Sequence, residues 1–283
     1  MKFILTGLIL LASLSVSAQK LEAYQIYNKK GRKVSFKKLV KSVKDKDIIL
    51  FGELHDNAIA HWMQLKLTQQ LHKENDLVLG AEMLETDNQN VLNQYLNDEI
   101  NQKGLDSLAR LWVNHKTDYK PLVDFAKTNQ LQFVATNIPR RYASLVYKKG
   151  FEALDSLPEK EKSWLPPLPI AYDANLPSYK KMLDMMPDHA NPNFPKAQAV
   201  KDATMAHFIL ENREKEQQFI HYNGAYHSDH FEGIYWYLQQ ASEDLKMVTI
   251  STVTQNDVGK LEKEYKGKAD FILVVDVEMT NTY

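Results

Sequence analysis

Two short stretches of the chain place ionisable side chains in a glycine turn directly after an apolar run. They are residues 47–55 and 219–227, and each contains the sequence Gly-x-x-His. The apolar runs are typical of buried strands. Glycine lets the backbone bend close to a ligand or take a positive φ. We therefore expect Glu53, His55 and His227 to lie at a functional site.

Other polar groups follow apolar runs in the same way. Glu82 follows residues 76–81, and Asn137 and Arg140 follow residues 132–136. In open α/β sheets the carboxyl ends of parallel strands meet at one edge, where ligands bind. These side chains should therefore lie together. Asp202, in a helix expected at 196–213, is a further candidate.

Two histidines and two glutamates are donors that suit Zn²⁺, Mn²⁺ or Fe²⁺. His55, His227, Glu53 and Glu82 are therefore predicted to hold a divalent metal ion, with Glu53 or Glu82 as general base if the site is hydrolytic. Structural roles stay open: Glu53 could cap a helix, and either histidine could be a hydrogen-bonded core residue. The chain has no Cys, no Gly-x-Ser-x-Gly and no phosphate loop, which excludes thiol chemistry and the common serine elbow.

The elements that would position these residues alternate between strands and helices. Apolar runs predict strands at 47–51, 76–81, 132–136, 218–222, 246–253 and 271–275, and helical spacing predicts helices at 57–73, 119–127, 139–148 and 196–213. This order predicts an α/β fold with a mostly parallel central sheet and helices on both of its faces. We expect His61, His72 and His115 to be surface residues.

Residues 163–196 break this alternation. They hold seven of the ten prolines together with several aromatic and methionine side chains. This composition fits neither a flexible linker nor a regular element. We expect a Pro- and Met-rich helical excursion, a lid or insertion, that covers apolar surface.

The composition is that of a soluble globular protein of 283 residues. A formal net charge of −1 gives no electrostatic case for nucleic acid or for an anionic membrane surface. Residues 1–18 have the positive start, apolar run and small-x-small ending of a secretory signal peptide. Without Cys the chain lacks disulfides and the residue for an N-terminal lipid anchor. We expect residues 19–283 to form one soluble domain, periplasmic or secreted.

Five ordered motifs make the chain resemble the ChaN-like haem-binding uptake proteins of the Tiki superfamily. They are residues 49–57, 80–83, 137–140, 197–206 and 224–227, and the resemblance spans about residues 35–253. It implies an α/β fold, haem binding linked to iron acquisition, and haems held face to face across a dimer. The wider superfamily includes metal-dependent proteases, whose shared site would correspond to Glu53, His55, Glu82 and His227.

The resemblance leaves two main functions open, beside a third in which the fold is inactive and serves only protein interaction. The first is an exported haem-binding protein in haem and iron acquisition, with haem, a second copy of the chain and haem-uptake machinery as partners. Tyr172, Tyr179 and His189 are then the predicted axial ligands, because haem iron takes Tyr or His from proteins. Arg140 and Arg141 are predicted to pair with the propionates. The second function is a metal-dependent hydrolase built on the strand-end residues.

Overall fold

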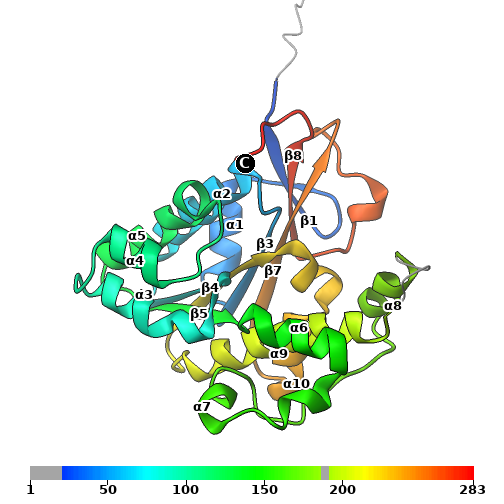
Figure 1. Ribbon diagram of the computed structural model, residues 1–283. Helices are drawn as coiled ribbons and strands as arrows, with labels where there is room; N and C mark the ends of the chain where they lie inside the picture. Colours follow the sequence, from blue (N-terminus) through cyan, green and yellow to red (C-terminus); the bar gives the residue numbers. More distant parts are fainter. Residues whose placement is uncertain (1–20, 186–190) are drawn as a thin grey trace, which may run out of the picture.

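The computed structural model describes residues 21–185 and 191–283, and one eight-stranded sheet organises this part of the chain (Figure 1). The predicted signal peptide at 1–18 and the predicted haem ligand His189 lie outside the described residues. The strands are β1 (Tyr24–Asn28), β2 (Lys33–Val34), β3 (Ile48–Glu53), β4 (Leu77–Glu85), β5 (Phe133–Asn137), β6 (Gln218–Gly224), β7 (Met247–Gln255) and β8 (Phe271–Asp276).

The sheet is mostly parallel, as the sequence predicts. Its order is β2-β1-β8-β7-β3-β6-β4-β5, and every neighbouring pair from β8 to β5 is parallel. Among the described strands only β1 and β2 break this pattern: they form a hairpin that joins β8 antiparallel. The carboxyl ends of β3, β6, β4 and β5 therefore lie side by side along one edge.

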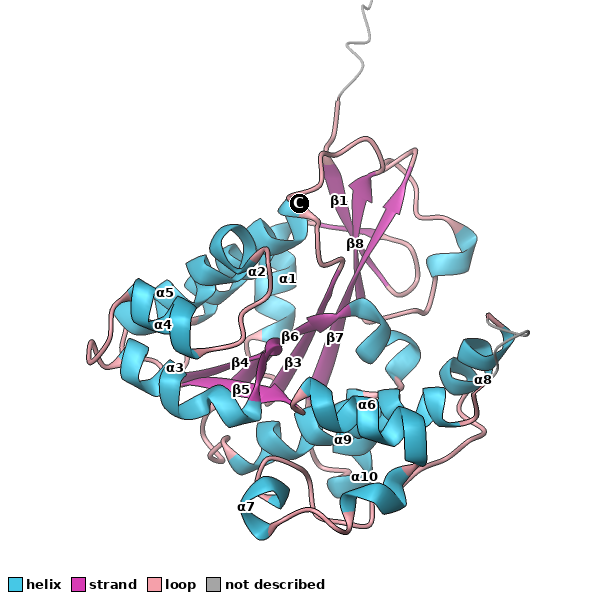
Figure 2. Cartoon of the chain, viewed as in Figure 1, coloured by secondary structure: helices cyan, strands magenta, loops and turns pink. Residues whose placement is uncertain are grey.

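Helices cover both faces of the sheet (Figure 2). Ile49 and Phe51 of β3 pack in the larger core with the helices between residues 36 and 128, whereas Ile48 and Leu50 pack with α9 (Asn193–Glu211) and α10 (Ile234–Ala241). Because successive strand side chains point to opposite faces, these cores are the two faces of one sheet. The helices are α1 (Phe36–Val43), α2 (Ala58–Leu71), α3 (Gln89–Leu96), α4 (Gln102–Leu108), α5 (Lys120–Thr128), α6 (Arg140–Lys149), α7 (Glu159–Lys162), α8 (Pro177–Asp184), α9 (Asn193–Glu211) and α10 (Ile234–Ala241).

Burial fixes the position of β3, the strand that carries Glu53. All six of its residues are buried. Each large apolar side chain removed from water contributes about 1.5–3 kcal/mol. A register slip by one residue would move Ile49 and Phe51 to the opposite face. The side chain of Asn57 then starts α2 by accepting a hydrogen bond from the backbone N–H of Ala60 at 2.9 Å.

The position of β6 is the feature of the topology that matters most for function. The sequence predicts a strand–helix–strand unit at 47–81, and its two strands are indeed parallel. They are not neighbours, however, because β6 lies between β3 and β4. Glu53 is paired in register with Gly224. The second Gly-x-x-His turn is thereby inserted between the strands that carry Glu53 and Glu82.

The described part of 163–196 contains α8 and irregular loops that lie against α9. Tyr179 and Met182 of α8 are buried in a small cluster with Ala199 of α9. Tyr226, which follows β6, donates a hydrogen bond to the carbonyl of Ser178 at 2.7 Å. The excursion therefore reaches the carboxyl edge of the sheet. Within the described residues, no helix has the length and apolar character required to cross a bilayer.

Candidate functional site

Glu82 and Gly224 join the ends of β4 and β6. The backbone N–H of Gly224 donates to Oε2 of Glu82 at 2.7 Å, and Glu82 is buried. A Cβ on Gly224 would lie 2.8 Å from Nε2 of His55 and 3.4 Å from Oε2 of Glu82. Glycine is therefore required here for the close approach of these side chains.

A buried ion-pair cluster surrounds His227. Its Nε2 lies 3.1 Å from Oε1 of Glu82, and its Nδ1 lies 2.5 Å from Oδ1 of Asp202 on α9. Burial alone would lower the pKa of His227, but the two carboxylates outweigh it and raise this pKa to about 10. Burial alone would raise the pKa of Glu82, yet His227 holds it well below its usual value. His227 is therefore a positively charged imidazolium between two acids.

The pKa of Asp202 shifts in the opposite direction from that of Glu82. Burial raises the pKa of Asp202 despite the attraction of His227. The sequence singled out Asp202 as a candidate, and the structure brings it into direct contact with His227. Gln198, one turn earlier on α9, lies 2.9 Å from the same Nδ1. Helix α9 thus supplies Asp202 and Gln198 as partners of Nδ1 of His227.

A second polar network surrounds Glu53, which is fully buried. Its carboxylate accepts hydrogen bonds from the hydroxyl of Tyr119 at 2.8 Å and from the amide of Gln64 at 2.6 Å. Nδ1 of His55 lies 3.0 Å from the same carboxylate. Burial raises the pKa of the Tyr119 hydroxyl, which keeps it a neutral donor. Glu53 does not cap α2, because Asn57 does.

His55 is the most accessible ionisable side chain of the two networks. A third of its side chain (34%) is exposed. Burial would lower the pKa of His55, but the hydrogen bond to Glu53 and the charge of Glu82 raise it. Within the described residues Nε2 has no hydrogen-bond partner. The ring packs edge-on against Trp112, with centroids 4.9 Å apart.

The predicted divalent metal site is not supported. Among the described residues, no three His, Asp or Glu side chains are arranged to hold a metal ion. The physical reason is that both ring nitrogens of His227 contact carboxylates. A protonated imidazole has no lone pair to give to a metal. His55 and Glu53 lie in the neighbouring network rather than in the same coordination shell.

Two histidines expected at the surface are buried instead, so that prediction is wrong for His61 and His115. Nε2 of His61 lies 3.1 Å from the carbonyl of His55, and its Nδ1 lies 3.4 Å from Glu53. This role could not be predicted from the sequence, because the buried face of α2 also includes polar residues such as Gln64. His72 is half-buried.

A pocket of about 630 Å³, called here the strand-end pocket, lies over these networks. His55 and His227 line it together with the backbone turn at Gly224. Its walls carry aromatic and aliphatic side chains that the sequence did not associate with the site. They are Leu54, Ala225, Tyr226, Val253, Tyr265 and Tyr283.

A second pocket of about 570 Å³, the arginine pocket, shares Tyr283 with the first. Arg140, Arg141 and Trp112 are among its lining residues. Arg141 forms an ion pair with Asp87 at 2.7 Å and stacks on Tyr142, whereas the guanidinium of Arg140 has no acidic partner within the described residues. Asp87 and the carboxylate of Glu85, which accepts a hydrogen bond from the backbone N–H of Arg140 at 3.1 Å, also offset the cost of cations at the start of α6.

Three further predicted residues line neither of these two pockets. Tyr179 is buried, and its hydroxyl lies 3.5 Å from Asp202. Tyr172 is stacked on Tyr179, half-buried, and its hydroxyl has no hydrogen-bond partner in the described part of the chain. Asn137, at the end of β5, is buried with an unpartnered Oδ1.

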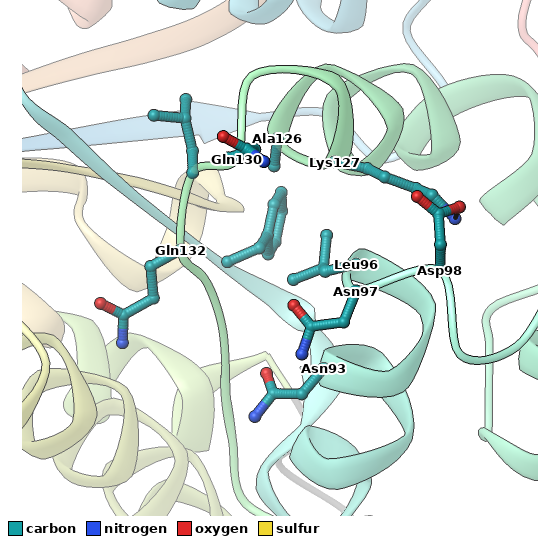
Figure 3. A pocket seen from close by; sticks show the side chains of 10 residues that line it. Asn93, Leu96, Asn97, Asp98, Ala126, Lys127, Gln130 and Gln132 are labelled. Atoms are coloured by element: carbon teal, nitrogen blue, oxygen red, sulfur yellow. Dashed lines mark ion pairs between the residues drawn. The ribbon is translucent and has the colours of Figure 1, made fainter.

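A further pocket of about 500 Å³ lies between α3, α5 and β5 (Figure 3). The labelled side chains include the amides of Asn93, Asn97, Gln130 and Gln132, and Lys127 forms an ion pair with Asp98 at 2.7 Å. No His, Tyr, Met or Cys lines it. It therefore offers no ligand for haem iron.

The family described as "Haem-binding uptake, Tiki superfamily, ChaN" matches residues 39–238, which confirms the family that the motifs indicate. The fold is similar to that of ChaN of Campylobacter jejuni, reported with cofacial haem binding, at 18% identity and a TM-score of 0.68, covering 89% of this chain and 97% of that one. It is also similar to a Bacillus cereus protein at 11% identity and a TM-score of 0.51, covering 86% and 92%. No curated protein matches. Because the family match extends over more than half of its length, this chain belongs to the ChaN family of haem-binding uptake proteins in the Tiki superfamily.

Proposed function

We propose that this protein binds haem at the carboxyl edge of its sheet, with the iron facing His55. Family membership supports haem as the ligand. One observation supports the location: Nε2 of His55 is unpartnered beside a pocket of about 630 Å³, within the usual range of about 300–1,000 Å³ for cofactor pockets. Haem brings its own porphyrin nitrogens and takes only axial ligands from the protein. The absence of a three-donor cluster among the described residues is therefore no obstacle.

His55 is already oriented for such a role. A metal-binding histidine usually donates its other ring N–H to a carboxylate or carbonyl, which fixes the tautomer and the ring. Glu53 provides this contact to Nδ1 at 3.0 Å, and Tyr119 and Gln64 hold Glu53 in turn. The ring of Trp112 limits rotation from the other side. These contacts would present Nε2 to the iron.

Arg140 is the residue best placed for a haem propionate. It lines the arginine pocket, next to the strand-end pocket, and has no acidic partner among the described residues. A guanidinium binds a carboxylate through two parallel hydrogen bonds. Arg141 was predicted for the same role, but its contact with Asp87 makes it the weaker candidate.

Tyr172 is the main competitor of His55 as axial ligand. Its free hydroxyl and the neighbouring ring of Tyr179 would suit an apolar macrocycle. It lines neither the strand-end pocket nor the arginine pocket, however, and for this reason we place the iron at His55. Tyr179 would have to leave its buried position to bind iron.

We further propose that two copies of the chain enclose haem, as cofacial binding in the Campylobacter jejuni protein would suggest. Val113 and Tyr283 line the arginine pocket and expose 89% and 63% of their surface. A second copy would remove this apolar surface from water. Export of residues 19–283 and transfer of haem to uptake machinery would complete a role in iron acquisition.

A metal-dependent hydrolase is the weaker alternative. It requires Glu53, His55, Glu82 and His227 to share one ion, and these residues are divided between two networks of ion pairs. The arrangement does not fit a divalent metal, so no hydrolytic step follows from it.

Titration with hemin tests the proposal. The mature protein should shift and sharpen the Soret band with saturation at a fixed ratio, and its mass by light scattering should double on loading. Unchanged hemin spectra at stoichiometric protein would refute haem binding. A saturable Soret shift with no change in mass would refute only the dimer.

A further inference from the structure

The net charge of −1 hides a strong local asymmetry. Residues 29–46 contain nine of the 35 Lys and Arg and one of the 36 Asp and Glu, so this segment carries a formal charge of +8 and the rest of the chain −9. The segment forms the β1–β2 hairpin, α1 and the turn into β3. The cations of this segment, called here the basic face, are Lys29, Lys30, Arg32, Lys33, Lys37, Lys38, Lys41, Lys44 and Lys46.

In the folded protein most cations of this segment lie at the surface and are not paired with an acid of the described residues. Leu39 and Val43 point α1 into the core, and its exposed charged positions are all lysines: Lys37, Lys38 and Lys41. Three cations of the basic face have an acid within 4 Å, namely Lys29, Lys33 and Lys44. The other six have no acidic side chain within that distance among the described residues.

The hairpin and the end of α1 meet at a common hollow. A pocket of about 410 Å³ is lined by Lys30 and Arg32 from the hairpin and by Ser42 and Lys46 from the end of α1 and beyond. Met247, the first residue of β7, and Phe271, the first residue of β8, also line it. This pocket therefore lies at the amino ends of β7 and β8, at the opposite end of the parallel strands from the carboxyl edge that carries His55.

We propose that the basic face docks the protein on an anionic phospholipid membrane. Each Lys or Arg near such a surface contributes to attraction over about one Debye length. Lysines outnumber arginines eight to one here, and flexible ammonium groups suit a diffuse layer of headgroups better than bidentate recognition of one phosphate. A single small anion in the pocket would leave the three α1 lysines unengaged, because none of them lines it.

Nucleic acid fits this surface less well. Proteins that bind single strands combine cations with exposed aromatic rings on which bases stack. The one aromatic residue of the segment, Phe36, packs against the core. On a membrane, this arrangement would leave the carboxyl edge of the sheet facing away from the lipid.

Co-sedimentation with vesicles tests this proposal and does not depend on haem. The mature protein should bind phosphatidylglycerol vesicles at about 0.1 M salt and should be released from them at about 1 M salt. It should not bind phosphatidylcholine vesicles. The triple variant Lys37→Gln, Lys38→Gln, Lys41→Gln should bind at least about tenfold more weakly. The matched control is Lys148→Gln, Lys149→Gln, Lys160→Gln, which removes three exposed lysines from the other side of the sheet and should bind like wild type.

Three results would overturn the proposal. They are failure to bind anionic vesicles, equal weakening by both triple variants, and full displacement from vesicles by millimolar inorganic phosphate, which would indicate a small-anion site instead. Circular dichroism of each variant verifies that the fold is intact, and the control variant provides the comparison if α1 is weakened.

Discussion

Nε2 of His227 lies 3.1 Å from Oε1 of Glu82, and this buried ion pair joins the end of β4 to the turn after β6. Removing one partner of a buried pair leaves an uncompensated charge and costs about 3–5 kcal/mol. We expect His227→Gln to lower the free energy of unfolding at pH 7 by about that amount in urea titrations. His207→Gln, a half-buried histidine on α9, should cost less than about 1 kcal/mol. Equal losses in both variants would contradict a special role for the pair.

The same pair predicts a pH dependence of stability. The pKa of His227 rises from 6.5 to about 10 on folding, so the stability that its protonation contributes is complete below about pH 6.5 and is lost as the pH rises to about 10. The lowered pKa of Glu82 acts in the opposite direction, because its contribution is present above about pH 4.5 and is lost in acid. Thermal melts of wild type and His227→Gln should therefore converge between pH 6.5 and 10. A constant difference across that range would be inconsistent with an imidazolium.

Two glycines at the site predict different outcomes when replaced by alanine. A Cβ on Gly224 would meet the ring of His55 at 2.8 Å, whereas a Cβ on Gly52 would meet the backbone of Ala225 at 2.8 Å. A side-chain tip can move, so Gly224→Ala should fold but bind hemin about tenfold or more weakly as His55 is displaced. Gly52→Ala should instead lower the melting temperature. Normal hemin binding by a folded Gly224→Ala protein would argue against His55.

Glu53 is predicted to control the protonation of His55. The hydrogen bond between them raises the pKa of His55, so Glu53→Gln should lower it. The ring proton shifts of His55, followed by NMR against pH in the haem-free protein, measure this directly. Glu74→Gln removes an exposed acid outside the site and should leave the titration of His55 unchanged. If the site holds haem, Glu53→Gln should also weaken it about 10–100-fold.

The sequence predicted the sheet well because each core strand is rich in apolar residues and is bounded by polar segments. It also predicted that Glu53, His55, Glu82 and His227 lie at one edge of the sheet. It could not give the order of the strands, since apolar runs carry no information about which neighbour they pair with. The insertion of β6 between β3 and β4 is therefore a property of the fold alone.

The partners of the site residues were harder to predict for a related reason. Tyr119, Gln64 and His61 lie on helical segments where a polar residue in an apolar face is indistinguishable from an exposed one. Only packing against β3 turns them toward Glu53. Asp202 was found because it lay within a recognised motif, but its contact with His227 depends on how α9 crosses the sheet. The separation of the four predicted metal ligands into two networks likewise depends on how the helices pack against the strands.

We expect haem iron to bind Nε2 of His55 in the strand-end pocket. The most direct test is a hemin titration, followed at the Soret band, of His55→Ala beside Tyr172→Phe. We expect His55→Ala to lose the shifted band while Tyr172→Phe titrates like wild type. Loss of the band in Tyr172→Phe with normal binding by His55→Ala would rule out His55 as the axial ligand and place the haem under the excursion instead.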